Sequence, residues 1–294
     1  MKSRKLTLLF ALSFLCSVVI AQDYAFKVMA NKGNNEIKSG NAWQPIKTGA
    51  SLKSGDELKL ADNSYIGLIH ASGKPLELKQ AGTHKVADLA ASITGGSSSL
   101  NKYTEFILSS NSDEKKNKLS ATGAVHRGDN SAAIKVRLPE NQYAGVYNTN
   151  VVVNWDAAKI AGPYVVNIRN MFEEQLANVE TSEPTIRIDF SQPKFAKETA
   201  VLIEVSSKAD AKQKSNQYLV RKLSSTDQEK VKKLLSDIMG EVSEHTALNY
   251  FILAGFYESQ GLLIDAIVAY EDAVKIEPSY GEDYDNFLIR NGLK

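Results

Sequence analysis

The sequence predicts a multidomain α+β protein, with a small all-β domain, then a β-sandwich, then α-helical hairpins at the C-terminal end. Residues 24–86 alternate short apolar runs with Gly, Asn and Asp turns. Residues 119–224 alternate apolar and polar side chains with a period of two, and residues 225–294 carry apolar side chains at helical spacing. The 294 residues are 43% hydrophobic and 23% charged, which excludes collagen-like, coiled-coil-only and wholly disordered chains.

The first residues have the three-part pattern of a secretory signal peptide. A basic start, residues 1–5, precedes an apolar run over 6–20 and a small residue, Ala21, before the expected cut. The run is shorter than the ~20 residues that span a bilayer, which favours cleavage over an uncleaved membrane anchor. Cys16 follows a leucine where a bacterial lipobox has Gly or Ala, so lipidation is the weaker alternative. We therefore expect residues 1–21 to be removed and the protein to be exported, to the periplasm or alternatively to the outer surface.

Removal of the signal peptide would leave a nearly neutral chain without cysteine. The whole sequence has 35 Lys and Arg against 34 Asp and Glu, and its single cysteine is Cys16. Three bases lie within residues 1–21, so the mature chain has 32 bases, 34 acids and a net charge of −2. This charge gives no argument for a nucleic-acid or membrane-surface partner. No second apolar run has spanning length, and disulfides and multi-cysteine metal sites are excluded.

Residues 22–86 are the predicted all-β domain, because strands of about 4–6 residues alternate with turn residues. A tryptophan, a glycine, a leucine and a Gly-Asp pair precede a strand, and a serine follows the next turn. These features are carried by Trp43, Gly49, Leu52, Gly55-Asp56, Asp62, Ser64, Tyr65–Ile69, Gly73, Leu76, Leu78 and Gly82-Thr83. This order resembles the FecR-like domain of exported bacterial proteins, including periplasmic regulators of iron uptake. The resemblance implies a periplasmic or cell-surface module that is not an enzyme, although the regulators' transmembrane helix is missing.

Residues 87–118 change to helical spacing and then to a polar linker. Apolar residues recur at helical intervals on both sides of a glycine- and serine-rich stretch, namely Leu89, Ile93, Leu100, Tyr103, Phe106 and Ile107. We expect two short helices that pack on the preceding β domain, the second capped by a serine. Residues 111–118 are polar and of mixed charge, which indicates a solvated linker.

Residues 119–224 contain six or seven strands with one apolar face each, which predicts a β-sandwich. The alternating segments lie around Ile134–Leu138, Val151–Trp155, Tyr164–Ile168, Ile186–Phe190, Val201–Val205 and Tyr218–Val220. The second and third of them resemble adjacent strands of a fibronectin type III or immunoglobulin-like domain. The resemblance implies that Trp155 and Tyr164 pack into one core. The lysines at 208, 212 and 214 are interpreted as a solvated hairpin loop.

Residues 225–294 are predicted to be helical, beginning at a cap at Ser225 or Thr226. Residues 247–280 span 34 positions, the tetratricopeptide period, and resemble that repeat. Its characteristic positions hold Tyr250, Leu253, Ala254, Tyr257, Gly261, Ala266, Tyr270, Ala273 and Pro278. One helix pair cannot bury both of its faces. We expect the helices at 226–241 and 284–293 to cover its ends, or the pair to dock on the β-sandwich or on a partner's helices.

No specific catalytic, cofactor or metal site emerges from the sequence. The histidines at 70, 84, 126 and 245 lack the companions of a metal-ligand motif, and we interpret them as surface or hydrogen-bonded side chains. A Gly-x-Ser-x-Gly elbow and a phosphate-binding loop are absent. The acid pairs Glu173-Glu174 and Glu282-Asp283 are better explained as exposed carboxylates than as glycosidase groups.

These features predict a non-enzymatic envelope protein that acts as a protein-binding adaptor or scaffold. Its partner-binding residues would lie on the repeat, at Leu248, Phe251, Glu258 and Ser259, with Phe251 as the anchor. The alternative for Phe251 is packing against the preceding helix. A carbohydrate- or cell-wall-binding protein, with or without hydrolytic activity, is the alternative function, and a sensor co-regulator is a third. The identity of the envelope partners and the presence of a homo-oligomer stay open.

Overall fold

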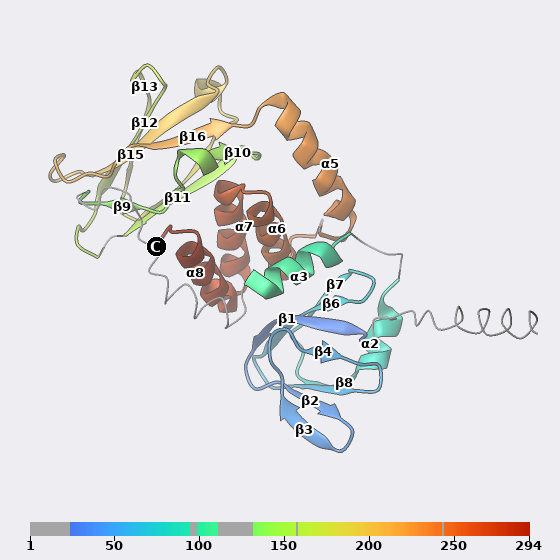
Figure 1. Ribbon diagram of the computed structural model, residues 1–294. Coiled ribbons are helices and arrows are strands. Elements are labelled where there is room, and N and C mark those ends of the chain that lie inside the picture. The colour runs from blue at the N-terminus through green and yellow to red at the C-terminus, as the bar shows by residue number, and fades with distance from the viewer. Residues whose placement is uncertain (1–23, 95–98, 111–131, 157, 243) are drawn as a thin grey trace, which may run out of the picture.

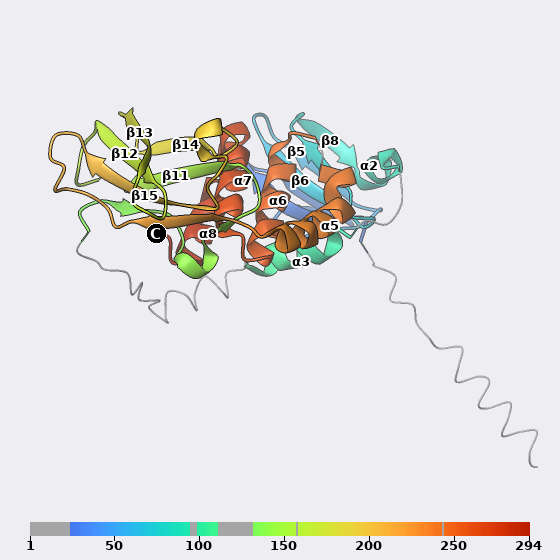
Figure 2. The same ribbon diagram turned by 90° about the horizontal axis from the view of Figure 1, so that it is seen from above.

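The computed structural model describes residues 24–94, 99–110, 132–156, 158–242 and 244–294. The signal peptide predicted for residues 1–21 and the linker predicted for 111–118 lie outside these ranges. The described residues form sixteen strands in four sheets and six α-helices. The expectation of a mixed α+β protein with C-terminal helices is therefore confirmed. Figures 1 and 2 show three parts in a row, with the C-terminal helices between two β units.

The first β unit consists of two four-stranded antiparallel sheets around one apolar core. One sheet has the order β4(Ser51–Leu52)-β1(Phe26–Lys32)-β6(Tyr65–His70)-β7(Pro75–Leu78). The other has the order β3(Ala42–Pro45)-β2(Glu36–Ser39)-β5(Glu57–Leu60)-β8(Gly82–Lys85). Both sheets contribute buried side chains to the core, among them Phe26, Leu52, Leu58 and Leu68. A glycine with φ of 89°, Gly73, makes the turn between β6 and β7, where other residues would be strained.

The two short helices after this unit pack in different places. Helix α2 (Val86–Ser92) follows β8 directly and adds Val86 to the core of the first β unit. Helix α3 (Asn101–Ser110) packs mainly on helix α6, since a Cβ at Gly255 would collide with the Ile107 side chain. Tyr103 and Phe256 also meet edge to face, with ring centroids 5.1 Å apart. Helix α3 also contacts the first β unit, where the Asn101 side chain donates to the Ala71 carbonyl at 3.0 Å, so the expectation that both helices pack on the β domain is met in part.

The second β unit packs a three-stranded sheet on a five-stranded sheet. Their orders are β14(Thr185–Asp189)-β11(Asn150–Asp156)-β9(Lys135–Val136) and β10(Gly145–Val146)-β16(Tyr218–Lys222)-β15(Ala200–Ser207)-β12(Tyr164–Arg169)-β13(Gln175–Thr181). Only β10 with β16 is a parallel pair among the ladders of the described strands. The apolar side chains of the alternating segments fill the space between the sheets. The rings of Trp155 and Tyr164 meet there at 5.1 Å.

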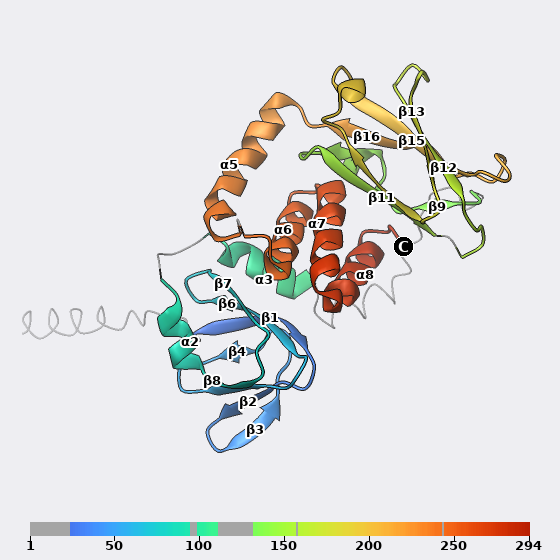
Figure 3. The same ribbon diagram turned by 180° about the vertical axis from the view of Figure 1, so that it is seen from behind.

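The C-terminal part begins with α5 (Ser225–Val242), which Figure 3 shows running from the end of β16 to the other helices. Helices α6 (Ala247–Ser259) and α7 (Leu263–Ile276) form a hairpin, with Gly261 at φ 71° between them. The 3₁₀ turn η3 (Pro278–Tyr280) and helix α8 (Gly281–Arg290) complete this part. Of the helices in the described ranges, none combines the length and apolar composition needed to cross a bilayer.

Candidate docking site

One end of the helical hairpin is attached to the first β unit. The hydroxyl groups of Tyr65 on β6 and Tyr280 on η3 are 2.8 Å apart in the interior. The Glu77 carboxylate accepts hydrogen bonds from the Tyr65 hydroxyl at 3.1 Å and from the Leu248 backbone N–H at 2.6 Å. This acidic group therefore satisfies an N–H in the first turn of α6, where negative charge is favourable. Burial raises the pKa of Tyr65, so its hydroxyl stays protonated and can donate.

The other side of the hairpin is attached to the sandwich. The buried carboxylate of Asp265, in the first turn of α7, accepts hydrogen bonds at 2.8 Å from the backbone N–H groups of Tyr147 and Asn148. Burial raises the pKa of Asp265 to about 6, against the opposing effect of these hydrogen bonds. Asn154 on β11 donates to Glu271 on α7 at 2.7 Å. The hairpin thus docks on the sandwich of its own chain, one of the arrangements considered from the sequence.

The four residues predicted to bind a partner contact this same chain. Leu248 and Phe251 are fully buried, and the Phe251 ring lies 4.7 Å from that of Tyr280. The Glu258 carboxylate is almost buried and pairs with Arg290 of α8, whose Nε is 2.6 Å away. The Ser259 hydroxyl donates to a carbonyl of its own helix. In this conformation the four side chains share α6 but do not form one exposed surface.

A groove of about 850 Å³ lies along the edge of the sandwich, a volume within the ~300–1,000 Å³ range of ligand pockets. Its walls come from residues 132–142, from the start of β16 at residues 216–218 and from residues 292–294. The apolar lining includes Ile134, Val136, Leu138, Pro139 and Leu293. Three cations and two carboxylates also line it, namely Lys135, Arg137, Lys294, Glu140 and Asp156. Because the Lys294 ammonium pairs with the Asp285 carboxylate at 2.7 Å, the groove combines apolar surface with charges of both signs that balance.

The loop between β12 and β13 exposes two large apolar side chains. Phe172 is 85% exposed and Met171 is 53% exposed, more than any other large apolar side chain of the described residues. The loop nevertheless has a defined conformation, because the buried Asn170 side chain accepts hydrogen bonds from the backbone N–H groups of Phe172 and Glu174 at 2.9 and 3.0 Å. Exposing a Phe side chain forgoes about 1.5–3 kcal/mol of burial. We call residues 170–174 the apolar tip.

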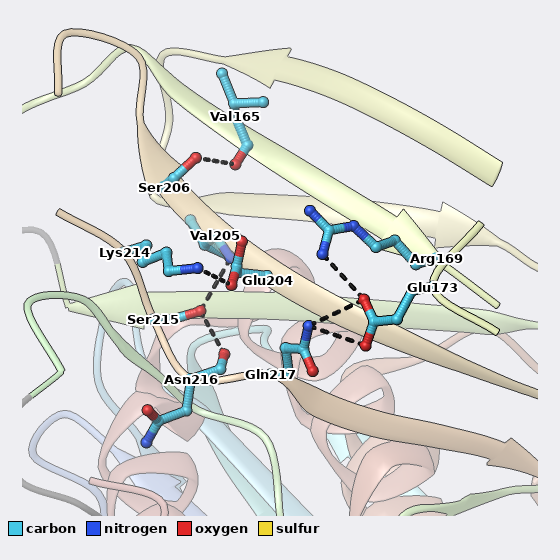
Figure 4. A network of polar contacts seen from close by, with 10 residues as sticks. All are labelled: Val165, Arg169, Glu173, Glu204, Val205, Ser206, Lys214, Ser215, Asn216 and Gln217. Carbon is cyan, nitrogen blue, oxygen red and sulfur yellow. Dashed lines mark hydrogen bonds and ion pairs between the residues drawn. The ribbon is translucent and has the colours of Figure 1, made fainter. Parts of the chain in front are cut away.

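Polar contacts on the outer face of the five-stranded sheet fasten the apolar tip, as Figure 4 shows. Arg169 Nη1 lies 3.1 Å from the Glu173 carboxylate. The Gln217 side chain donates to the same carboxylate at 3.4 and 3.5 Å. Glu173 itself has a positive φ of 65°, a conformation that these contacts help to hold. Gln217 also lines the groove, so one residue connects the apolar tip with the groove.

The loop between β15 and β16 is fixed on the same face. The Lys214 ammonium lies 2.8 Å from the Glu204 carboxylate. The Ser215 hydroxyl accepts from the Val205 backbone N–H and donates to the Asn216 carbonyl, at 2.9 and 2.7 Å. The lysine cluster interpreted as a solvated loop therefore includes a lysine that anchors this loop to the sheet. These bonds hold the wall of the groove at residues 216–218.

The described histidines make separate local contacts. Nδ1 of His70 lies 2.8 Å from the Ser72 hydroxyl, Nε2 of His84 lies 3.2 Å from the Gln80 carbonyl, and Nδ1 of His245 lies 2.6 Å from the Tyr250 hydroxyl. His126 lies outside the described residues. Within the part of the chain that the structure describes, no group of three or more His, Cys, Asp or Glu side chains is arranged to hold a metal ion.

No protein-family model and no curated protein sequence matches the chain. The apolar tip was not singled out in the sequence. Its signal is the pair Met171-Phe172 within a polar turn, between Asn170 and two glutamates. Large apolar residues are unusual in such turns, where Gly, Asn, Asp and Ser dominate.

Proposed function

We propose that the protein is an exported, non-enzymatic scaffold of the bacterial envelope that docks a protein partner at the edge of its sandwich. The observation that carries this proposal is the pair of large apolar side chains exposed on a hydrogen-bonded loop. Exposed apolar surface of this kind marks interaction sites, and aromatic anchors dominate binding energy. A loop that is already ordered loses little entropy on binding.

The helical hairpin supports the scaffold part of the proposal. Its two sides are occupied by the two β units, through Tyr280 on one side and Asp265 on the other. We therefore place the partner contact on the apolar tip and the groove, instead of on Phe251. Export rests on the signal-peptide pattern of residues 1–21.

Carbohydrate binding has less support from the arrangement of aromatic rings. The most exposed aromatic side chains of the described residues, Trp43, Tyr143 and Phe172, lie on three separate elements. They therefore do not form a row on one face of the sandwich. Incubation of the pure protein with peptidoglycan and envelope polysaccharides tests this alternative, which pull-down or product release would support.

Photo-crosslinking in intact cells tests the docking proposal. A photo-reactive residue at Glu174, next to the apolar tip, is expected to label a defined protein, and Phe172→Ala should abolish this labelling. A photo-reactive residue at Trp43, an exposed aromatic position on β3 of the first β unit, is the matched control and should not label the same protein. Labelling at Glu174 that is absent, or that is unchanged by Phe172→Ala, would overturn the proposal.

A further inference from the structure

Among the strands that the structure describes, β13 pairs only with β12 and forms one edge of the five-stranded sheet. We propose that this edge pairs with the same edge of a second copy of the chain, antiparallel and around a two-fold axis at Val179. The five-stranded sheets of the two copies would then join into one continuous sheet. The inference rests on β13 and goes beyond the proposed function, which concerns the apolar tip and the groove.

Strand β13 is the longest edge strand of the described sheets. It has seven residues, whereas β4, β9 and β10 have two, β3, β7 and β8 have four, and β14 has five. Natural proteins keep edge strands short or place Lys and Pro in them, because unpaired backbone groups invite a further strand. Residues 175–181 contain neither Lys nor Pro. Strand β13 is therefore the edge best suited to accept another strand.

The hydrogen bonds of the inner strands determine which backbone groups of β13 face outwards. The Pro163 carbonyl accepts a hydrogen bond of 2.9 Å from the residue that follows β15, so its backbone points toward β15. Successive residues of a strand direct their backbone groups to opposite sides, so every second residue of β12 from Tyr164 onwards faces β13. Val179 lies opposite one of these residues. The N–H and C=O groups of its neighbours Asn178 and Glu180 therefore point to the open edge.

An antiparallel pair centred on Val179 uses these outward groups. Asn178 of one copy lies opposite Glu180 of the second copy, and such a pair exchanges both of its backbone hydrogen bonds. The two-fold axis repeats this pair with the roles of the copies reversed. Between the two pairs, Val179 faces Val179 of the second copy.

The side chains of this register are compatible on both faces of the sheet. On the inner face, Val179 lies opposite the buried Val166 of β12 and is itself half-buried, so a second Val179 adds apolar contact. On the outer face, the Glu180 carboxylate pairs with Lys208 at 2.6 Å and would lie opposite the Asn178 amide. Glu180 is the only charged residue of β13, so like charges, which destabilise a strand pair, do not oppose each other.

A second copy fits this edge better than a single strand of another protein. Its β13 is already ordered within a sheet, so it loses little entropy on pairing. Two-fold pairing also covers both open edges at once, whereas a single added strand would present a new open edge. The net charge of −2 expected without residues 1–21 opposes association only weakly. A strand of another protein at this edge is an outcome of the experiments below.

The first experiment measures the mass of the chain without residues 1–21 by sedimentation equilibrium over a series of concentrations. We expect a monomer–dimer equilibrium whose dissociation constant rises at least about 10-fold in Asn178→Pro, because proline removes an N–H that bonds across the dimer in both copies. This N–H faces outwards, so the ladder with β12 and the far-ultraviolet circular dichroism should be preserved.

Asn178→Ala is the matched control for the proline variant. It shortens the same side chain but keeps the N–H, so it should weaken the dimer far less than Asn178→Pro. A chain that stays monomeric at all concentrations, or a dimer that is equally stable in Asn178→Pro, overturns the proposal.

The second experiment tests the register. The chain without residues 1–21 has no cysteine, so Val179→Cys introduces a single thiol. Residues that face each other between hydrogen-bonded pairs have Cα atoms ~4.5 Å apart, within the ~4.4–6.8 Å that a disulfide spans. We expect oxidation to link two chains through position 179, and no link in the control Asn167→Cys, on the neighbouring strand β12. A dimer that Val179→Cys does not link, or that Asn167→Cys links as readily, overturns the pairing.

The outcomes separate this inference from the proposed function. If the chain is monomeric while the photo-reactive residue at Glu174 labels another envelope protein in a Phe172-dependent way, self-pairing is wrong and the scaffold proposal stands. If the dimer forms as described and no other protein is labelled, the scaffold proposal falls and the dimer stands. If a photo-reactive residue at Asn178 labels another protein instead of a second copy, the choice of occupant is wrong.

Discussion

The two β units are attached to one helical hairpin in different ways. The first unit shares an apolar cluster with the helices, in which Met29, Tyr65 and Ile69 pack with side chains of α6, α7 and α8. The sandwich has its own core, to which the helices add Ile264, and Val152 of β11 joins the apolar cluster of the helices. Its attachment adds buried polar groups to this packing, above all the Asp265 carboxylate and the Asn154 side chain.

This difference has physical consequences for the two joints. Apolar burial is non-directional and responds little to pH or salt. Buried hydrogen bonds are directional, and they fail when a partner is removed or changes its protonation. The sandwich joint therefore includes a buried carboxylate with a raised pKa, whereas the first β unit combines a larger shared apolar cluster with the hydrogen bonds of Tyr65 and Glu77. The following substitutions test this contrast, from the largest expected effect to the smallest.

Tyr280→Ala should weaken the apolar joint most. Tyr280 is fully buried against Phe251 and Tyr65, and large-to-small substitutions at such sites cost about 3–5 kcal/mol. Urea denaturation should show the loss in the free energy of unfolding. Tyr143→Ala, at an exposed tyrosine, is the control and should cost within about 0.5 kcal/mol. Equal losses in the two variants would contradict a shared apolar core.

Asp265→Asn should remove a pH dependence from the polar joint. Burial raises the pKa of Asp265 from its usual 3.8 to about 6. The folded state then binds the proton of Asp265 more tightly than the unfolded state does. This tighter binding stabilises the fold in full below pH 3.8, and the stabilisation is lost as the pH rises through about 6. The difference in unfolding free energy between wild type and variant should fall by about 3 kcal/mol from pH 3.5 to pH 7. If the unfolding free energies of wild type and variant changed in parallel over this range, a raised pKa of Asp265 would be contradicted, because the two proteins share all other titrating groups.

Tyr280→Phe should have a small effect that does not depend on pH in the same range. The substitution keeps the ring and removes the 2.8 Å contact with the Tyr65 hydroxyl, which still donates to Glu77. A loss of about 1 kcal/mol is expected from one hydrogen bond. Thermal unfolding at two pH values measures it, with Tyr143→Phe as the control. A loss as large as that of Tyr280→Ala would mean that the hydroxyl pair, and not packing, holds the first unit.

Arg187→Gln should have the smallest effect. Arg187 on β14 lies 2.6 Å from Asp272 on α7, but the arginine side chain is 43% exposed. Exposed ion pairs contribute about 0–1 kcal/mol and weaken as salt rises. Urea denaturation at low and high salt should show a small loss that disappears at high salt. A loss that exceeds about 2 kcal/mol at both salt concentrations would place the polar joint at this pair instead of at Asp265.

The alternation of apolar residues was sufficient to locate most strands. Segments such as Val151–Trp155 and Tyr164–Ile168 have one buried face, which leaves a period of two in the sequence. Strand β13 was not anticipated, because it forms the edge of its sheet and its side chains are exposed or half-buried. Strand β10, of two residues, is too short to show a period.

The binding residues were harder to find for a related reason. Helical periodicity identifies Leu248 and Phe251 as one apolar face of α6, but it does not say what covers that face. Glu77 contacts this face from a distant, earlier segment, and Tyr280 contacts it from a segment that follows α7. Phe172 is exposed on a loop between two strands, whose backbone the Asn170 side chain fixes by a hydrogen bond.

The sequence by itself determined the classes of element, their order and the export pattern, because periodicity, turn residues and a short apolar run are local properties. Only the tertiary structure decided which apolar faces stay exposed and how the parts are joined. The Asp265 carboxylate meets the Tyr147 and Asn148 backbone across more than a hundred residues of chain. Such contacts follow from how the sheets and helices pack, and packing depends on side chains that no local window contains.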